Sequence, residues 1–186
     1  INEVEQGLRH IILDGNRAAD VLGRIRALIH KTPPQRQPVS LNLLIEEMVG
    51  FSRGEALKHG AEVSVELAAD LPFVVADRVE LQQVLLNLII NSLEAMTIMA
   101  EGQRRLLIRS EALGDNVHIS VSDSGPGFAC ERAEQVFTAF FTTKSTGLGM
   151  GLSICRTIIE GHGGKLWAER NEPRGARVVF GLPRCE

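Results

Sequence analysis

Residues 81–91 read Leu-Gln-Gln-Val-Leu-Leu-Asn-Leu-Ile-Ile-Asn, and this stretch decides the fold. Its apolar side chains surround nearly the whole circumference of a helix, which is typical of a helix buried inside a domain. One narrow polar line remains, with spacings of three or four that put its members on one face. The line consists of Glu80, Gln83, Asn87, Asn91 and Glu94.

This polar line has two interpretations. It is either a solvent-facing stripe, or a row in which Asn87 and Asn91 face a polar ligand. The second interpretation would give the buried amides a hydrogen-bond partner, because a buried amide without one lowers stability by about 1–3 kcal/mol.

The helix has a clear start, because Asp77 followed three residues later by Glu80 is a capping box. We expect it to run to about Ala100. Ser40 is predicted to cap an earlier helix, which Gly60 ends. The predicted helices are 40–59, 77–100 and 150–160, with a short helical piece near 131–136, and the predicted strands are 62–67, 73–75, 105–112, 117–122, 164–170 and 176–182. Segregated helices and antiparallel strands predict an α+β fold, a two-layer sandwich of a mixed, mainly antiparallel sheet with helices on one face.

Three regions follow one another along the chain. Residues 1–31 are predicted to form a long helix, 32–39 a proline-rich linker, and 40–186 a domain. The helix has a heptad repeat, made by Ile1, Val4, Leu8, Ile11, Gly15, Ala18, Leu22, Ile25 and Ile29. The repeat favours packing in a dimeric bundle, and the alternative is an amphipathic helix that lies on its own domain. Because the chain begins inside this helical pattern, we expect a fragment of a longer protein.

Composition excludes several classes of function. The chain has 186 residues, 44% of them hydrophobic, and a net charge of −3 without a basic block, so nucleic acid is a poor candidate for a partner. No apolar run reaches the roughly 18 residues of a membrane span, so we expect no membrane contact. The cysteines Cys130, Cys155 and Cys185 are far apart, which argues against a disulfide framework or a zinc site and favours the cytoplasm.

A first glycine-rich segment, Asp123-Ser-Gly-Pro-Gly-Phe128, directly follows an apolar strand. Its glycines let the chain approach a ligand closely. A carboxylate at the strand end can accept a hydrogen bond from the exocyclic amine of adenine, whereas guanine would leave it unpaired. The plainer interpretation is a surface turn.

A second glycine-rich segment, Gly147-Leu-Gly-Met-Gly-Leu152, opens the helix that runs to Glu160. Free N–H groups and the helix dipole make such a start a phosphate site. Lys144 lies just before it and can pair with phosphate oxygens. The segment does not follow a strand closely and no P-loop motif occurs, so neither a dinucleotide-binding fold nor a P-loop fold is supported.

Together these segments resemble the ATP-binding domain of sensor histidine kinases. Residues 81–91 look like the N box, 123–127 like the first glycine box, and 147–151 like the second. Phe137 to Lys144, reading FTAFFTTK, resembles the F box, and 162–167 and 180–183 are similar to the end of such domains. The likeness extends over 77–183 and weakens toward the N-terminus.

The resemblance implies a Bergerat-type ATP-binding fold, shared with gyrase, the ninety-kilodalton chaperones and MutL. It implies that Asn91 supplies an oxygen to Mg²⁺ and that Asp123 binds the adenine amine, with residues 128–148 as a lid. Asn87, Asn91 and Lys144 would be catalytic. The implied ATP-binding residues are Asn87, Asn91, Asp123, Gly125, Gly127, Phe128, Lys144, Gly147, Leu148, Gly149, Met150, Gly151 and Leu152.

Two positions depart from the family's pattern. Ser92 stands where alanine is usual, a change we expect to be harmless. Arg177 stands where many members have a threonine that helps to hold a water beside adenine, so we expect Arg177 close to Asp123.

The sequence favours a kinase over a hydrolase. Gyrase-like and chaperone ATPases place a glutamate base four residues before the magnesium-binding asparagine, and here that residue is Asn87, which cannot take a proton. Transfer of the ATP γ-phosphoryl group to a neutral imidazole needs less activation of the nucleophile. The alternatives are a hydrolytic ATPase of the same fold and a degenerate binding scaffold.

None of the histidines here is the expected phosphate acceptor. His10 lies off the heptad seam, and His162 lies at a helix C-terminus, where a cation is favoured. By resemblance, residues 1–31 are the second helix of the dimerisation domain, and the acceptor lies outside the fragment. The implied partners are that histidine-bearing helix, a second copy in a homodimer, and the receiver domain of a response regulator, whose aspartate takes the phosphoryl group.

Overall fold

The computed structural model describes residues 35–100, 103–128, 134–142 and 149–185. Several predictions lie outside these residues. They are the long helix of 1–31, the first half of the short helical piece near 131–136, and the site residues Lys144, Gly147 and Leu148.

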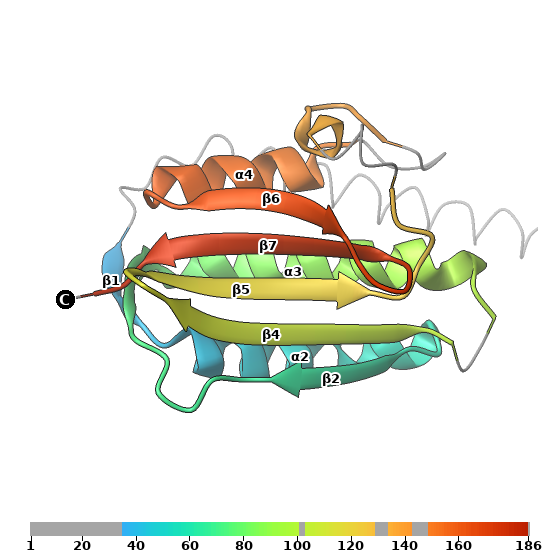
Figure 1. Cartoon of the computed structure of the whole chain (residues 1–186), viewed down its shortest axis with the longest axis horizontal. Coiled ribbons are helices and arrows are strands. Elements are labelled where there is room, and N and C mark those ends of the chain that lie inside the picture. The colour runs from blue at the N-terminus through green and yellow to red at the C-terminus, as the bar shows by residue number, and fades with distance from the viewer. Residues whose placement is uncertain (1–34, 101–102, 129–133, 143–148, 186) are drawn as a thin grey trace, which may run out of the picture. The chain divides into compact units, whose positions relative to one another are not determined.

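A five-stranded sheet forms one layer of the domain, with the strand order β2-β4-β5-β7-β6 (Figure 1). Strands β2 and β4 are parallel, and the other neighbours are antiparallel. The strands are β2 (Glu62–Glu66), β4 (Arg105–Leu113), β5 (Asn116–Asp123), β6 (Lys165–Arg170) and β7 (Ala176–Pro183). The sheet is therefore mixed and mainly antiparallel, as predicted.

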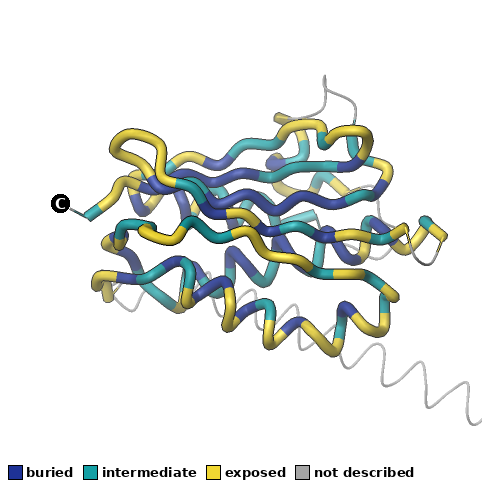
Figure 2. Tube along the Cα trace, turned by 60° about the horizontal axis from the view of Figure 1, so that its bottom comes forward, coloured by how far each residue is buried: buried dark blue, intermediate teal, exposed yellow. Residues whose placement is uncertain are grey.

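Three helices form the second layer, all on one face of the sheet (Figure 1). They are α2 (Leu41–Lys58), α3 (Arg78–Ala95) and α4 (Gly151–Gly161). Helix α3 lies between the other two and packs against both. Because alternate residues of a strand face opposite sides, the helix-facing side chains of the sheet make the core with these helices, as the buried segments in Figure 2 show.

Helix α3 is buried as its sequence predicts, with Leu81, Leu85 and Ile89 fully inside. Its last turn ends at Ala95, and a short 3-10 turn, η1 (Met96–Ile98), follows, so the predicted end near Ala100 was too late. The reason is local, because Met96 stays buried and anchors this tighter turn.

Asp77 caps α3, since its Oδ1 accepts hydrogen bonds from the N–H groups of Val79 at 2.9 Å and Glu80 at 3.2 Å. The other half of the predicted capping box is wrong. The Asp77 N–H donates to Nε2 of His162 at 2.9 Å, not to Glu80. Nδ1 of His162 lies 2.8 Å from the carbonyl oxygen of Ile158, so the ring connects the end of α4 with the start of α3.

The end of the predicted linker is a strand. Strand β1 (Arg36–Val39) pairs antiparallel with β3 (Val74–Asp77) in a separate two-stranded sheet. Pro38 is tolerated there because a strand at an edge can lack one donor. Ser40 occupies the cap position of α2 without a side-chain hydrogen bond, whereas Gly60, with a φ of 56°, ends that region as predicted.

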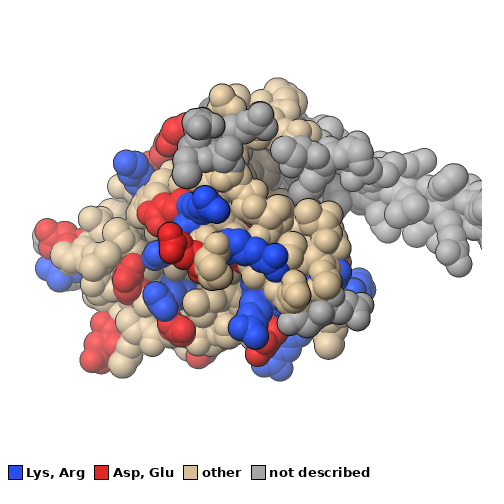
Figure 3. All heavy atoms as spheres, turned by 45° about the vertical axis from the view of Figure 1, so that its right-hand side comes forward, with Lys and Arg blue, Asp and Glu red and all other residues tan. Residues whose placement is uncertain are grey.

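The outer face of the sheet is covered with charged side chains of both signs, which Figure 3 shows interspersed. Arg109 and Glu66 form an ion pair across β4 and β2.

Candidate functional site

Those predicted site residues that the structure describes come from elements that meet at one end of the sandwich. The C-terminal end of β5, the second half of α3 and the N-terminal end of α4 all lie at the right-hand side of Figure 1. Antiparallel chain directions produce this meeting, since α3 runs toward this end and α4 runs away from it. The site therefore combines three segments that are far apart in the sequence.

Asp123 is the last residue of β5, and only 4% of its surface is exposed. Its Oδ1 accepts hydrogen bonds from the N–H groups of Gly125 at 2.9 Å and Ala176 at 3.1 Å. These bonds fix the carboxylate at the start of the glycine-rich turn.

Burial raises the pKa of the Asp123 carboxyl above its ordinary value of 3.8. Hydrogen bonds from the Ala176 N–H, the Gly125 N–H and the Ser92 hydroxyl oppose this rise. Three hydrogen-bond donors thus stabilise the buried carboxylate, which is a hydrogen-bond acceptor. Ser92, expected to be a harmless change, is one of them.

Glycines let the chain approach Asp123 closely. A Cβ on Gly175 would lie 1.8 Å from the carbonyl oxygen of Asp123, and one on Gly127 would lie 2.5 Å from the carbonyl oxygen of Gly175. Asn171 donates its side-chain N–H to the same Asp123 carbonyl at 2.8 Å. The β6–β7 turn is therefore pressed against the glycine-rich turn.

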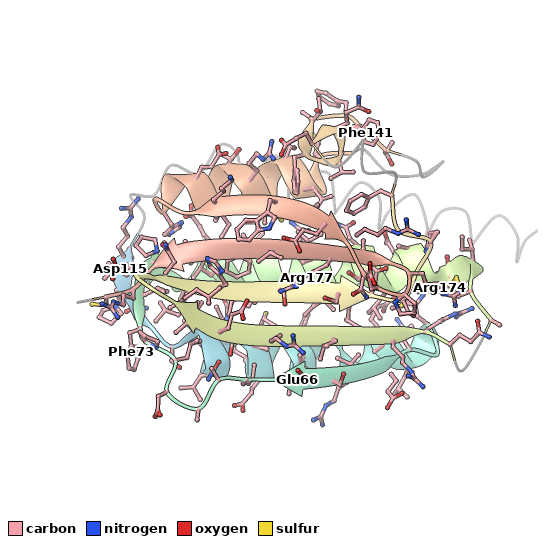
Figure 4. All side chains as sticks on the ribbon, in the orientation of Figure 1. Glu66, Phe73, Asp115, Phe141, Arg174 and Arg177 are labelled. Atoms are coloured by element: carbon pink, nitrogen blue, oxygen red, sulfur yellow. The ribbon has the colours of Figure 1, made fainter. Side chains whose placement is uncertain are left out.

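A pocket of about 280 Å³ opens at this contact. Its lining is Pro126, Gly127, Phe128, Arg170, Arg174 and Gly175. Phe128 lies in this lining, as a residue predicted to bind the ligand, whereas Asn87 and Asn91 do not. Among the described residues, the pocket adjoins the first glycine box and the β6–β7 turn. The label of Arg174 in Figure 4 marks its position.

Asn91 lies against the start of α4. A Cβ on Gly151 would be 3.5 Å from Nδ2 of Asn91, which is ordinary contact distance. Gly151, Leu152 and Met150 are all partly exposed here. The N box and the second glycine box are thus brought together, as their predicted roles require.

Asn87 lies one turn earlier on α3, and its side chain lies beside the buried thiol of Cys155 on α4. The same Sγ is 3.9 Å from the carbonyl oxygen of Val84. Asn87 is therefore placed beside Asn91, and Cys155 is a neighbour that the sequence did not single out.

The start of α4 has no side-chain cap, since Met150 occupies the cap position. The first N–H groups of any helix lack intrahelical partners. Gly149 holds this start against the F box, because the Phe140 N–H donates to its carbonyl oxygen at 3.0 Å. A Cβ on Gly149 would lie 2.6 Å from the carbonyl carbon of Phe140, so only glycine fits.

A 3-10 turn, η3 (Gln135–Phe137), attaches the F box to α4. Phe137 is buried, and the guanidinium of Arg156 lies 4.2 Å from its ring centroid. Arg156 also pairs with Glu134 at 2.9 Å. The aromatic residue of this box therefore packs into the domain, while Phe140 is largely exposed.

The expectation for Arg177 is wrong. Arg177 pairs with Ser122 in the β5–β7 register, so its side chain is on the outer face of the sheet, away from the carboxylate of Asp123. Its guanidinium lies between Glu111 at 3.8 Å and Glu169 at 3.9 Å. Figure 4 labels Arg177 on the outer face of the sheet. The residue beside Asp123 is Ala176.

Residues 76–186 match the family described as histidine kinase-, DNA gyrase B- and HSP90-like ATPase. The chain belongs to this family. The site residues predicted from the sequence all lie within the matched range.

Relatives of this ATPase domain are sensor histidine kinases. The chain is 39% identical over 186 residues to the sensor protein FixL of Bradyrhizobium diazoefficiens and 37% identical over 185 residues to the sensor histidine kinase TmoS of Ectopseudomonas mendocina. These alignments cover 99% and 98% of the chain but only 36% and 19% of the relatives.

Solved structures agree with this assignment. The catalytic domain of the histidine kinase ThkA is 38% identical, with a TM-score of 0.72, over 80% of this chain and 95% of that one. A complex of ThkA with the response regulator TrrA has a TM-score of 0.76 at 32% identity, over 95% of this chain and 51% of that one. Full-length ShkA in complex with AMPPNP has a TM-score of 0.76 at 26% identity, covering 91% and 35%. The ATPase domain is thus a catalytic domain of the histidine kinase type.

Proposed function

We propose that this domain binds ATP with Mg²⁺ and transfers the γ-phosphoryl group to a histidine outside the fragment, for relay to the aspartate of a response regulator. The observation that supports this most is the buried Asp123 carboxylate at the end of β5, kept by three donors beside a close-packed glycine turn. Such an acceptor suits the exocyclic amine of adenine and would leave a guanine carbonyl unpaired.

Two other segments would bind the phosphates. The start of α4, with Gly149, Met150, Gly151 and Leu152, offers helix N–H groups and the positive end of the dipole to an anion. Lys144, Gly147 and Leu148 lie outside the described residues, and their contact with phosphate stays part of the proposal. The AMPPNP complex of the related ShkA supports ATP as the nucleotide.

Magnesium fits the residues that are present. Within the described residues, no group of three or more His, Cys, Asp or Glu side chains could hold a metal ion. Magnesium does not need one, because it keeps several waters and binds through one or two protein oxygens and the phosphates. Asn91, beside the start of α4, would supply the protein oxygen, and the ion would neutralise phosphate charge.

The site favours transfer over hydrolysis. Asn87, in the position of the hydrolases' glutamate, is an amide, so it cannot activate water as a general base. In the transfer, an imidazole nitrogen forms a bond to the γ-phosphorus, the bond to the bridging oxygen breaks, and ADP leaves. The domain's residues orient the nucleotide and stabilise charge.

The remaining parts of the proposal concern the whole protein. The partners would be the histidine-bearing helix of its own dimerisation domain, a second copy of the protein, and a response regulator. We assign residues 1–31 to that dimerisation domain as its second helix. The ThkA–TrrA complex supports the response regulator as a partner. Among the described helices, none is long and apolar enough to cross a membrane. We propose a cytoplasmic location for this domain.

A calorimetric titration with ATP, with and without Mg²⁺, tests the pocket. We expect ATP to bind and GTP not to bind. Asp123→Asn should lower ATP affinity at least about tenfold, since a hydrogen bond to a charged group contributes about 1.5–3 kcal/mol. Asn91→Ala should remove the dependence on Mg²⁺. Failure of the folded protein to bind any nucleotide would favour the degenerate scaffold.

Two activity measurements separate the kinase from the hydrolase. We expect no label on the purified fragment after incubation with γ-labelled ATP, because the acceptor histidine is outside it. When the full dimerisation domain is added, we expect label to appear on its acceptor histidine. Steady release of phosphate by the fragment alone would instead support a hydrolytic ATPase.

A further inference from the structure

Three strands meet at the end of the sheet that carries Asp123. Strands β5 and β6 end there and β7 begins there, at the right-hand side of Figure 1. In the register of these strands Val121 pairs with Val178, and Val178 pairs with Ala168. All three side chains contact the core on the helix-facing side of the sheet. This core row therefore shows which residues of the next row face the same side.

The next row consists of Asp123, Ala176 and Arg170. Each lies two residues from a member of the core row, and alternate residues of a strand face the same side. Arg170 pairs with Ala176 across β6 and β7, and the Ala176 N–H donates to Oδ1 of Asp123 at 3.1 Å. The side chain of Ala176 is only a methyl group, so little bulk separates Arg170 from the buried carboxylate.

The side chain of Arg170 is exposed, and it forms no hydrogen bond or ion pair with the described residues. It lines the pocket of about 280 Å³ together with Gly127 and Phe128 of the first glycine box. Arg174 also lines this pocket, but its Nη2 donates to Oε1 of Gln103 at 3.1 Å. Of these two arginines, Arg170 is the one with all of its donors available.

The row thus offers a hydrogen-bond acceptor and a donor side by side. The carboxylate of Asp123 accepts hydrogen bonds, and the guanidinium of Arg170 only donates them. Adenine presents the complementary pair, because its exocyclic amine donates and the adjacent ring nitrogen N1 accepts. In guanine both roles are reversed, since a carbonyl oxygen replaces the amine and N1 carries a hydrogen. A site with both groups would leave two polar contacts unpaired with guanine instead of one.

We propose that Arg170 is a specificity-determining residue of the nucleotide site, whose guanidinium donates a hydrogen bond to N1 of adenine while Asp123 accepts one from the exocyclic amine. The inference rests on the proposed function, because it assumes that adenine lies against Asp123. The arginine is free to turn toward the base, since no described residue holds its side chain. Arg170 lies outside all of the sequence motifs described above, so no motif indicates it.

Nucleotide analogues test this contact at a single atom. In 1-deaza-ATP a C–H group replaces N1 and the exocyclic amine stays, whereas 7-deaza-ATP keeps N1 and lacks a different ring nitrogen. By calorimetry with Mg²⁺, we expect the wild type to bind 1-deaza-ATP about tenfold more weakly than ATP, as for one lost hydrogen bond. The affinity for 7-deaza-ATP should stay within about twofold of that for ATP.

The variant Arg170→Ala should lose this preference. We expect it to bind ATP about tenfold more weakly than the wild type does, and to bind ATP and 1-deaza-ATP equally well. Its Tm should equal that of the wild type, because the side chain it removes is exposed and unpaired. Arg174→Ala is the matched control, since it removes the same charge from the same pocket. It should keep the wild type's preference for ATP over 1-deaza-ATP.

Several results would overturn the proposal. If Arg170→Ala weakens ATP and 1-deaza-ATP by the same factor, the arginine acts through its charge and not through N1. A loss with 7-deaza-ATP but not with 1-deaza-ATP would equally refute the assignment to N1.

The same titrations separate this inference from the proposed function. If the wild type binds ATP and 1-deaza-ATP equally well, the proposed function stands and the role of Arg170 is refuted. If the wild type binds no nucleotide, the proposed function fails and the role of Arg170 fails with it.

Discussion

Asp123 combines two opposed demands in one side chain. In the proposed role toward adenine it must accept a hydrogen bond from the exocyclic amine, but burial raises the pKa of its carboxyl. The unfolded chain releases this proton near the ordinary value of 3.8, and the folded chain releases it at a higher pH. Between these two values the folded state binds more protons, so stability falls as pH rises through the window.

Asp123→Asn should therefore be at least as stable as the wild type without ligand. An amide can accept the same hydrogen bonds from Gly125 and Ala176 without a buried charge. We expect its advantage in unfolding midpoint to grow as pH rises from near 3.8 to neutral. Thermal unfolding across that range checks this, with the exposed Asp70→Asn as control. A variant that loses stability in parallel with the wild type would contradict the mechanism.

For single residues, the sequence predicted those that belong to a motif. It missed the residues from other elements that contact the motif in the folded domain. Asp123, Gly125 and Gly127 follow one another along the chain, so their arrangement is local. Ser92 and Ala176 reach the same carboxylate from α3 and β7, and no pattern in either element indicates this. The error over Arg177 has a related cause, because the side of the sheet depends on register.

Among the elements, η3 depends on a few contacts for its place on α4. Arg156 stacks on the buried ring of Phe137 and pairs with Glu134. A cation–π contact contributes about 0.5–1 kcal/mol and an exposed ion pair about 0.2–1 kcal/mol. The attachment is therefore modest, in keeping with a segment next to a nucleotide site.

Arg156→Ala should loosen this attachment without unfolding the domain. We expect amide hydrogen exchange over residues 134–141 to rise about fivefold, which corresponds to about 1 kcal/mol. Exchange within β5 should stay unchanged. Arg109→Ala, which removes an ion pair to Glu66 on the outer face of the sheet, is the control. An equal rise in both variants would indicate a general loss of stability.

Element type could be predicted where the pattern is strong. Helix α3 and the two hairpins follow from apolar periodicity and turn glycines, and the described structure has them. Strand β1 was missed, because Pro38 and its neighbours read as a linker until β3 lies beside them. Half of the capping box was predicted wrongly, because the Asp77 N–H donates to His162 at the end of a distant helix and not to Glu80.

For the whole molecule, nucleotide binding should raise the free energy of unfolding. A ligand that binds only the folded state stabilises it by about 2.7 kcal/mol at a concentration of 100 times Kd. For a chain of this size that is a rise in Tm of about 5–10 °C. We expect this rise with Mg-ATP and none with GTP, and differential scanning calorimetry would measure it. A rise with GTP would contradict adenine recognition by Asp123.

The cap position of α4 has a meaning for protein engineering. Met150 occupies a place where serine or aspartate typically adds about 1 kcal/mol of stability. A redesign aimed at thermostability would select that change, and the new side chain would bind the same N–H groups that we assign to phosphate. A stabilised variant obtained in this way would compete with its own substrate, so position 150 should be held fixed in any library selected for heat resistance.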